Sequence, residues 1–200
     1  LGTLNILEAT RMAPTVKGVI IASSDKAYGK SKTMYNETDP LLGDHPYEVS
    51  KSATDQIATM YWKTYGVPVV VTRFGNIYGE GDHNFNRIIP GIMESVFAKK
   101  KLKIRSDGRY VRDYVYAKDV AGAYLFLLER LKKIKGEVFN VSSDDTFSVI
   151  DLIGKIEKII PAKINYRIVN TAVNEIPYQH LNFNKIKKLG WRPQYKLVSS

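Results

Sequence analysis

The chain has 200 residues, a net charge of +10 and no cysteine; 44% of its residues are hydrophobic and 25% are charged. This is an ordinary globular composition, which excludes a mainly disordered or fibrous chain. The lack of cysteine excludes disulfides, thiol catalysis and cysteine-ligated zinc. The three histidines lie far apart in the sequence, so we expect no metal site. No apolar run reaches the roughly 18 residues of a membrane span and no leader pattern is visible, so we predict a cytoplasmic protein that has no membrane partner.

Much of the positive charge lies in short lysine clusters at 99–101, 132–133 and 185–188. Such clusters can neutralise nucleic-acid phosphates, or they can be solvated helix ends where lysine complements the helix dipole. No aromatic residues are interleaved with them and no nucleic-acid-binding signature stands nearby, which favours solvated helix ends. An anionic small substrate is a third use of the charge. We therefore expect no nucleic-acid partner.

Hydrophobic spacing along the chain predicts an α/β fold. Helices are expected at 3–12, 46–65, 88–99, 119–131, 147–160 and 184–189. Apolar runs at 16–22 and 67–74 are typical of buried parallel strands, and further strands are expected at 137–141 and 164–169. Residues 104–115 are expected to form a hairpin, and 23–43 and 75–86 to be loops. The alternation of strands and helices predicts a doubly wound parallel sheet.

The first candidate motif is Ser-Ser-Asp-Lys-Ala-Tyr-Gly at 23–29, directly after a predicted strand. In an open α/β sheet, ligands bind outside the carboxyl ends of the strands. Hydroxyl, carboxyl and amine groups are therefore expected to project together into a site. A plain polar turn after a strand explains the motif equally well.

The second motif is Tyr47-Glu-Val-Ser-Lys51, which opens the predicted helix 46–65. Residues four apart share one face of a helix, so the ammonium is expected beside the phenol. That arrangement stabilises a phenolate and lets tyrosine act as a general base. The same spacing is common by chance in helices that have only a structural role.

Two further motifs could bind an anion. Arg-Phe-Gly-Asn-Ile-Tyr-Gly at 73–79 ends the second predicted strand, and its glycines permit close approach of a ligand. The segment 105–115 contains Arg105, Arg109 and Arg112, whose planar guanidinium groups suit phosphate. A solvated arginine-rich hairpin is the alternative for this segment.

Together and in this order, the motifs resemble the extended short-chain dehydrogenase/reductase family, in its nucleotide-sugar epimerase and dehydratase branch. The resemblance runs from L-G-T-L-N-I-L-E-A at the start to L-N-F-N-K-I-K-K-L-G-W-R-P near the end. Within the family, S-S-D-K-A-Y-G, R-F-G-N-I-Y-G-E-G-D and I-R-S-D-G-x-x-V-R-D-Y are most similar to CDP-glucose 4,6-dehydratases. The resemblance implies NAD as cofactor, a nucleotide-diphosphate sugar as substrate and a role in polysaccharide biosynthesis.

The resemblance also implies roles for the motif residues. Tyr47 matches the base that takes the proton of the 4-hydroxyl while NAD takes the C4 hydride, and Lys51 matches its partner at the nicotinamide ribose. Ser24 matches the hydroxyl that bonds to the sugar O4, and Asp25 matches the acid that protonates the leaving 6-hydroxyl. Lys26 stands where most sugar dehydratases carry Glu, the base for the C5 proton; as a base it must be neutral.

The remaining site residues follow from the same resemblance. Ser23 and Phe74 join Tyr47 and Lys51 as cofactor contacts. Substrate contacts are expected at Asn76, Arg87, Arg105 and Arg112, with Asn76 and Arg112 at the diphosphate.

The domain organisation implied by the resemblance is that of an incomplete Rossmann-type domain. The family begins with a G-x-x-G-x-x-G loop that binds the cofactor pyrophosphate, and this sequence contains no such loop. We therefore expect a chain truncated at its N-terminus and inactive in isolation, whose first sheet strands are missing. Residues 1–78 and about 111–141 are expected to belong to the NAD-binding domain, and 79–110 and 142–200 to a smaller α/β substrate-binding part.

Three functions remain open from the sequence. A 4,6-dehydratase needs Asp25 and Lys26 as well as Tyr47 and Lys51, whereas a 4-epimerase or reductase needs only the tyrosine–lysine pair. The Asp25–Lys26 pair favours the dehydratase. A noncatalytic nucleotide-sugar-binding fragment is the third possibility, supported by the lack of the glycine-rich loop. A homodimer is expected through helices 2–12 and 47–65, with Tyr61, Trp62 and Tyr65 as candidate contacts that core burial would explain equally well.

Overall fold

The computed structural model describes residues 1–173 and 175–197. The remaining positions of the predicted substrate-binding part, 174 and 198–200, lie outside the described residues. In chain order, the elements are α1 (Gly2–Met12), β1 (Val19–Ala22), the short 3-10 helix η1 (Asp25–Tyr28), α2 (Pro46–Tyr65), β2 (Val69–Phe74), β3 (Asn76–Tyr78), α3 (Ile88–Phe97), β4 (Leu102–Ile104), β5 (Val111–Tyr116), α4 (Ala117–Ile134), β6 (Val138–Val141), β7 (Thr146–Ser148), α5 (Val149–Ile156), β8 (Tyr166–Ile168) and α6 (Asn184–Lys188).

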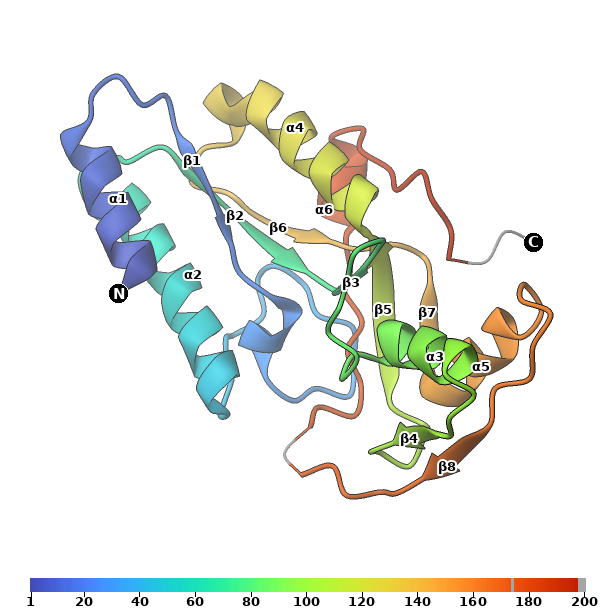
Figure 1. Ribbon diagram of the computed structural model, residues 1–200. Coiled ribbons are helices and arrows are strands. Elements are labelled where there is room, and N and C mark those ends of the chain that lie inside the picture. The colour runs from blue at the N-terminus through green and yellow to red at the C-terminus, as the bar shows by residue number, and fades with distance from the viewer. Residues whose placement is uncertain (174, 198–200) are drawn as a thin grey trace.

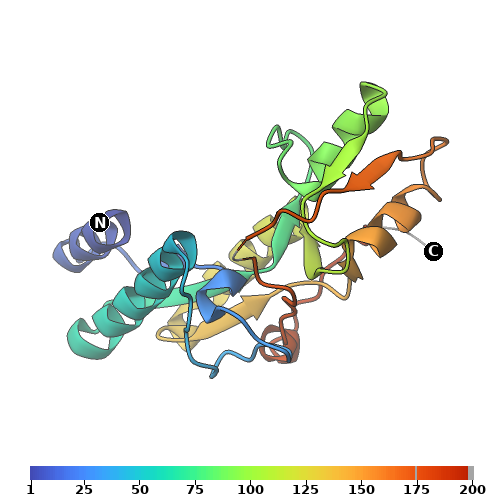
Figure 2. The ribbon, with the colours of Figure 1, turned by 90° about the horizontal axis from the view of Figure 1, so that it is seen from below.

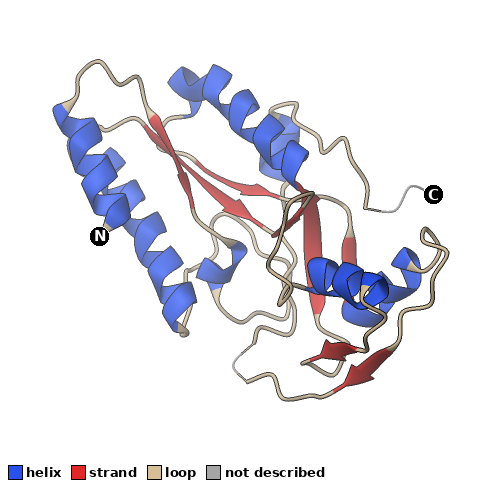
Figure 3. Cartoon of the chain, in the orientation of Figure 1, coloured by secondary structure: helices blue, strands red, loops and turns tan. Residues whose placement is uncertain are grey.

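The central sheet consists of three parallel strands in the order β1-β2-β6, with Ile20 opposite Val70 and Phe74 opposite Val141. Helices α1 and α2 lie on one side of it, and α4 and α6 lie on the other (Figure 1 and Figure 3). The predicted α/β class with parallel, doubly wound strands is confirmed. The strands are runs of β-branched residues because both of their faces are buried.

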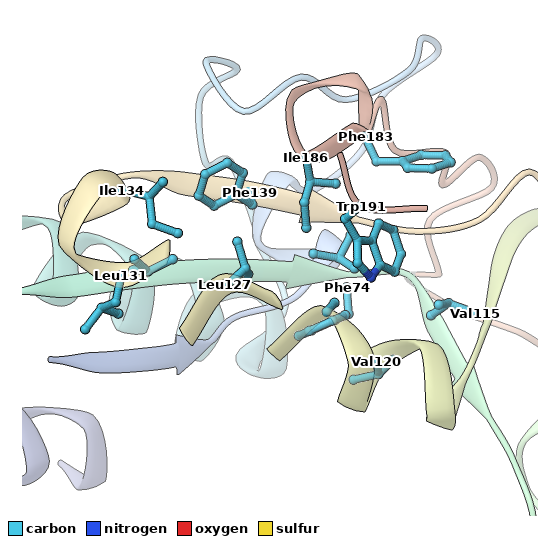
Figure 4. Packing of buried hydrophobic residues seen from close by; sticks show 13 residues of the cluster. Phe74, Val115, Val120, Leu127, Leu131, Ile134, Phe139, Phe183, Ile186 and Trp191 are labelled. Carbon is cyan, nitrogen blue, oxygen red and sulfur yellow. The ribbon is translucent and has the colours of Figure 1, made fainter. Parts of the chain in front are cut away.

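Alternating residues of β2 belong to two different hydrophobic cores. Val69 and Val71 pack with residues of α1 and α2, whereas Val70 packs with α4 and β6. The core on the α4 side is the larger, and Figure 4 shows how α4, β6 and the C-terminal segment fill it. Phe183, Ile186 and Trp191, which the prediction grouped with the substrate-binding part, pack into this core.

A second group of elements lies at the end of the molecule opposite α1 (Figure 2). It contains the sheet β3-β5-β7, the parallel pair β4-β8, and helices α3 and α5. Its separate core is built from isoleucines, leucines and one tyrosine: Ile92, Leu102, Ile104, Tyr114, Leu152, Ile153, Ile156 and Ile164. The two groups of elements therefore have separate hydrophobic cores.

Four local predictions were wrong. The segment 23–43 is not all loop, since Asp25–Tyr28 forms the 3-10 helix η1. The expected hairpin 104–115 does not form, because β4 pairs in parallel with β8 and β5 pairs with β3 and β7. The segment 75–86 is not all loop, since β3 pairs with β5. The predicted helix 147–160 is shortened to α5, because Thr146–Ser148 forms β7 and Ser148 caps the helix.

A buried ion pair fixes β2 against α2 and η1. Arg73 on β2 makes a bidentate pair with Asp55 on α2, with N–O distances of 2.7 and 2.8 Å, and also donates to the Tyr28 hydroxyl at 2.7 Å. Both members of the pair are almost fully buried, so the loss of either one would leave an uncompensated charge. This pair joins β2, α2 and η1, which carry several of the candidate site residues.

No helix in the described part of the chain is long and apolar enough to cross a membrane.

Candidate active site

A cavity of about 1120 Å³ opens beside the carboxyl ends of β1 and β2. The structure brings most of the predicted site residues to its wall: Ser23, Ser24, Asp25, Lys26, Tyr47, Lys51, Phe74, Asn76, Arg87, Arg105 and Arg112. Arg109, the third arginine considered for phosphate binding, does not line the cavity. The lining residues come from the turn after β1, from η1, α2, β2, β3 and β5, and from the loops before α3 and after β4. Residues as far apart as 23 and 112 therefore share one site of the size expected for a large ligand.

The turn after β1 holds Asp25 in a buried position at the start of η1. Ser24 caps η1, its hydroxyl accepting from the Lys26 N–H at 3.2 Å and donating to Asp25 Oδ1 at 2.9 Å. Asp25 is only 4% exposed. Lys26, the next residue, is half-buried. Carboxyl, hydroxyl and ammonium groups thus line one short stretch of the cavity wall.

Burial raises the pKa of Asp25 from 3.8 to about 6. The neighbouring Asp113 adds to the rise, while Lys26, the Ser24 hydroxyl and Arg112 oppose it. A carboxyl with such a pKa is partly protonated near neutral pH, as a general acid must be. The structure therefore supports the predicted role of Asp25 in proton donation.

The same pKa makes a prediction about stability. Since the pKa in the folded state is raised, Asp25 destabilises the fold progressively as the pH rises from about 4 to about 6. A rise of about two pKa units corresponds to about 3 kcal/mol. We expect Asp25→Asn to be more stable than the wild type by up to that amount at pH 8, with the difference lost near pH 4. Urea unfolding at both pH values measures it, and an equal difference at both would contradict the raised pKa.

Tyr47 and Lys51 lie on the first two turns of α2, which begins at Pro46. The Lys51 ammonium lies 5.8 Å from the centre of the Tyr47 ring and donates to the Ala22 carbonyl at 3.1 Å. The Ser23 hydroxyl donates to the Lys51 carbonyl at 3.3 Å. These bonds anchor α2 to the end of β1. The ammonium is therefore held beside the phenol, whose side chain is 48% exposed at the cavity.

Arginines form the opposite part of the wall. The Arg112 guanidinium is 11% exposed, donates to the carbonyls of Val111 and Pro177 at 2.8 and 3.4 Å, and lies 3.8 Å from Glu175. Burial lowers the pKa of Arg112. Arg105 lies 3.7 Å from the same Glu175 carboxylate and is mostly exposed.

Two further predicted substrate contacts complete this wall. Arg87 pairs with Asp82 at 3.1 Å and remains mostly exposed. The Asn76 amide donates to the Asp113 carbonyl at 3.3 Å. The wall is therefore positively charged and suited to an anionic ligand.

Sequence analysis missed two residues of this region. Glu175 lies between two of the predicted arginines, and Gln179 donates to Asp25 Oδ2 at 2.9 Å. Gln179 is 154 residues from Asp25 in the chain, and no local pattern marks it. Only the tertiary fold brings these residues to the site.

Comparison with known proteins agrees with this geometry. Residues 1–142 match the NAD dependent epimerase/dehydratase family. The chain belongs to this family. The family is NAD-dependent, and its members share the Rossmann-like fold seen here.

One relative of this chain is the dTDP-D-glucose 4,6-dehydratase of Homo sapiens, which is 30% identical over 96% of the chain and 56% of the relative. A putative UDP-glucose 4-epimerase of Methanocaldococcus jannaschii is 31% identical over 98% of the chain and 64% of the relative. The crystal structure of dTDP-glucose 4,6-dehydratase from Bacillus anthracis in complex with NAD superposes with a TM-score of 0.87 at 30% identity, covering 98% of this chain and 62% of that one. The chain thus spans less than two thirds of the length of these relatives.

The cavity suits one end of the family's cofactor. An ammonium (Lys51), two hydroxyls (Ser23 and Tyr47) and an aromatic ring (Phe74) line the same wall at the end of β1 and β2. The polar groups can bond to the hydroxyls of a ribose, and the aromatic ring can pack against the flat nicotinamide ring. The donor set therefore fits the nicotinamide-ribose portion of NAD.

Proposed function

We propose that the whole protein is an NAD-dependent nucleotide-sugar 4,6-dehydratase acting on CDP-glucose. The observation that carries the proposal is the buried Asp25 carboxyl with its raised pKa, lining the same cavity as Lys26 and the Tyr47–Lys51 pair. Dehydration needs two sets of groups. Tyr47, activated by Lys51, provides the general base for oxidation, and Asp25 and Lys26 provide the acid and the base for elimination. The name of the human relative supports the same reaction. A cytoplasmic location remains a prediction.

The side chains carry out four proton transfers with the substrate. Tyr47 takes the proton of the 4-hydroxyl, with Lys51 stabilising the phenolate and Ser24 bonding to O4. Bound NAD, which Lys51, Ser23 and Phe74 would hold, would supply the hydride acceptor for C4 and the hydride donor for C6. The C5 proton, made acidic by the new 4-ketone, goes to Lys26, and Asp25 gives its proton to the 6-hydroxyl, which leaves as water. When C6 receives the hydride, C5 regains its proton from Lys26; Tyr47 then releases its proton to solvent and Asp25 takes one up, which restores the starting state.

Lys26 serves as a base only when its amine is neutral. Lys26 is half-buried and lines the same cavity as Lys51 and Arg112. The proposal therefore assigns Lys26 the role of the base as a neutral amine, next to Asp25 as the acid.

Arg112 provides a test of substrate binding. We expect Arg112→Ala to weaken binding of the nucleotide sugar by about 2–3 kcal/mol, the size of a lost charge-assisted hydrogen bond. Calorimetric titration of the whole protein measures the affinity, with the exposed Arg167→Ala on β8 as control. An unchanged affinity in Arg112→Ala would leave Arg112 with only its structural bonds to Val111 and Pro177.

A 4-epimerase or reductase is the second candidate function. The name of the Methanocaldococcus jannaschii relative favours it, and Tyr47 with Lys51 is sufficient for oxidation at C4. In that enzyme Asp25 would have no proton to deliver to a leaving group.

We propose a homodimer through α1 and α2, which pack against each other at one end of the molecule (Figure 1). Their outer surface exposes apolar side chains, among them Ile6, Met60 and Tyr65. Of the candidate contacts from the sequence, Tyr61 is buried in the core and bonds to Glu8, so it is not available for a partner.

Product analysis separates the candidate functions. The whole protein is incubated with NAD and CDP-glucose, and in parallel with dTDP-glucose and UDP-glucose, and the sugar product is examined by mass spectrometry. We expect a product one water lighter than the substrate, formed fastest from CDP-glucose. A product of unchanged mass with C4 inverted would refute the dehydratase and establish the epimerase.

A further inference from the structure

The segment 177–182 forms a strap that is held from both sides. On one side, the Gln179 N–H donates to the Val111 carbonyl of β5 at 3.1 Å. On the other side, the Tyr35 N–H donates to the His180 carbonyl at 2.8 Å. Because backbone bonds fix the residue at its own N–H and at its neighbour's carbonyl, the Gln179 side chain projects from a well-anchored base.

The Gln179 side chain ends at the Asp25 carboxyl. Its Nε2 donates to Asp25 Oδ2 at 2.9 Å, while the Ser24 hydroxyl donates to Oδ1 at 2.9 Å. Each carboxyl oxygen therefore accepts a bond from a different part of the chain. Together the two donors fix both the position and the plane of the carboxyl.

Gln179 is poorly explained as a stabilising residue. It is 1% exposed, and within residues 1–173 and 175–197 its Oε1 has no hydrogen-bond partner. A buried amide oxygen without a partner costs free energy, and an apolar side chain of the same size would avoid that cost. The bond to Asp25 is the one side-chain hydrogen bond that Gln179 makes in the described chain.

Apart from the neutral Ser24 hydroxyl, the other groups that face Asp25 are charged or ionisable. Lys26 comes from its own helix η1, Arg112 and Asp113 come from β5, and Tyr35 comes from the loop between η1 and α2. Gln179 differs from them because it is neutral at every pH and bonds directly to the carboxyl. An amide donor stabilises the carboxylate more than the acid, since charge-assisted bonds are the stronger ones.

We propose that Gln179 is a positioning residue for Asp25: its amide orients the carboxyl toward the cavity and bonds to the ionised form. The inference rests on the proposed function, in which Asp25 must donate a proton and later be protonated again. Without the amide, burial would hold Asp25 protonated to higher pH and slow its release of the proton.

The test is a 13C NMR titration of the whole protein with labelled aspartate, in which Asp25 is assigned by its absence in Asp25→Asn. We expect Gln179→Met to raise the pKa of Asp25 by about one unit, as the loss of a charge-assisted donor should. The control Gln56→Met, on the exposed face of α2, should leave the pKa unchanged. Thermal unfolding should show Gln179→Met at least as stable as the wild type near pH 5, which a purely structural role would not allow. An unmoved Asp25 titration overturns the inference.

A second variant covers the case in which Gln179→Met fails to fold. Gln179→Glu keeps the shape and places a second carboxyl beside Asp25, so the pair should titrate with a raised apparent pKa; an unshifted titration overturns the inference. In Gln179→Met, the pH at which the elimination rate falls on the alkaline side should rise by the same amount as the pKa of Asp25. An unchanged pH profile overturns the claim that Gln179 acts on catalysis. Failure of the proposed function is seen separately, as the absence of a dehydrated product from the wild type.

Discussion

Tyr47→Phe is expected to abolish turnover of the whole protein while leaving binding of the nucleotide sugar intact. The substitution removes only the hydroxyl that takes the 4-hydroxyl proton, and the ring keeps its place over Lys51 and the cavity. Loss of a general base typically slows a reaction by about 10²–10⁴-fold. Loss of the base at the first step should stop every later step as well, because elimination needs the 4-ketone.

The measurement is steady-state turnover together with calorimetric binding of the substrate. Tyr65→Phe is a matched control, since Tyr65 lies at the far end of the same helix and is 53% exposed. It should turn over like the wild type. Near-normal turnover in Tyr47→Phe would remove Tyr47 from its assigned role and would leave the tyrosine–lysine pair without a catalytic function.

Asp25→Asn is expected to slow elimination by about 10²–10⁴-fold without stopping oxidation at C4. Asparagine has a similar shape and can still accept from the Ser24 hydroxyl at its amide oxygen, but it has no acidic proton to give to the leaving hydroxyl. Oxidation depends on Tyr47 and Lys51, which are held by separate bonds to the end of β1. Since the hydride cannot be returned until water has left, reduced nicotinamide should accumulate on mixing with substrate, and stopped-flow absorbance detects it.

Lys26→Met should have the same effect for a different reason. Without the base, the C5 proton is not removed, so its exchange with deuterated water should also be suppressed. Lys30→Met, on the exposed residue just beyond η1, is the control and should behave as the wild type. If neither Asp25→Asn nor Lys26→Met affects elimination selectively, the acid–base pair has been assigned wrongly.

The parts of the site that could be predicted are those encoded in short stretches of sequence. Ser23 to Lys26 follow a strand directly, and Tyr47 and Lys51 share a helix face, so spacing and strand order alone placed them near one another. The structure adds how they are held: Lys51 bonds to Ala22, and Ser24 bonds to Asp25.

The parts that could not be predicted depend on contacts between distant segments. A hairpin was expected around Ser106–Gly108 because turn residues separate two apolar runs, yet β4 pairs with β8, more than 60 residues further along the chain. Gln179 reaches Asp25 across 154 residues. Local propensity carries no information about such pairings, which are decided by tertiary packing. The burial that raises the pKa of Asp25 is likewise a property of the folded chain.

The most direct test of the dehydratase assignment follows the hydrogen at C4. The whole protein is given NAD and CDP-glucose deuterated at C4, and the position of the deuterium in the product is determined by NMR. The proposed sequence of oxidation, elimination and return predicts a 4-keto-6-deoxy sugar that has lost water and carries the deuterium at C6. A product that retains its water and carries the deuterium at an inverted C4 would contradict the account.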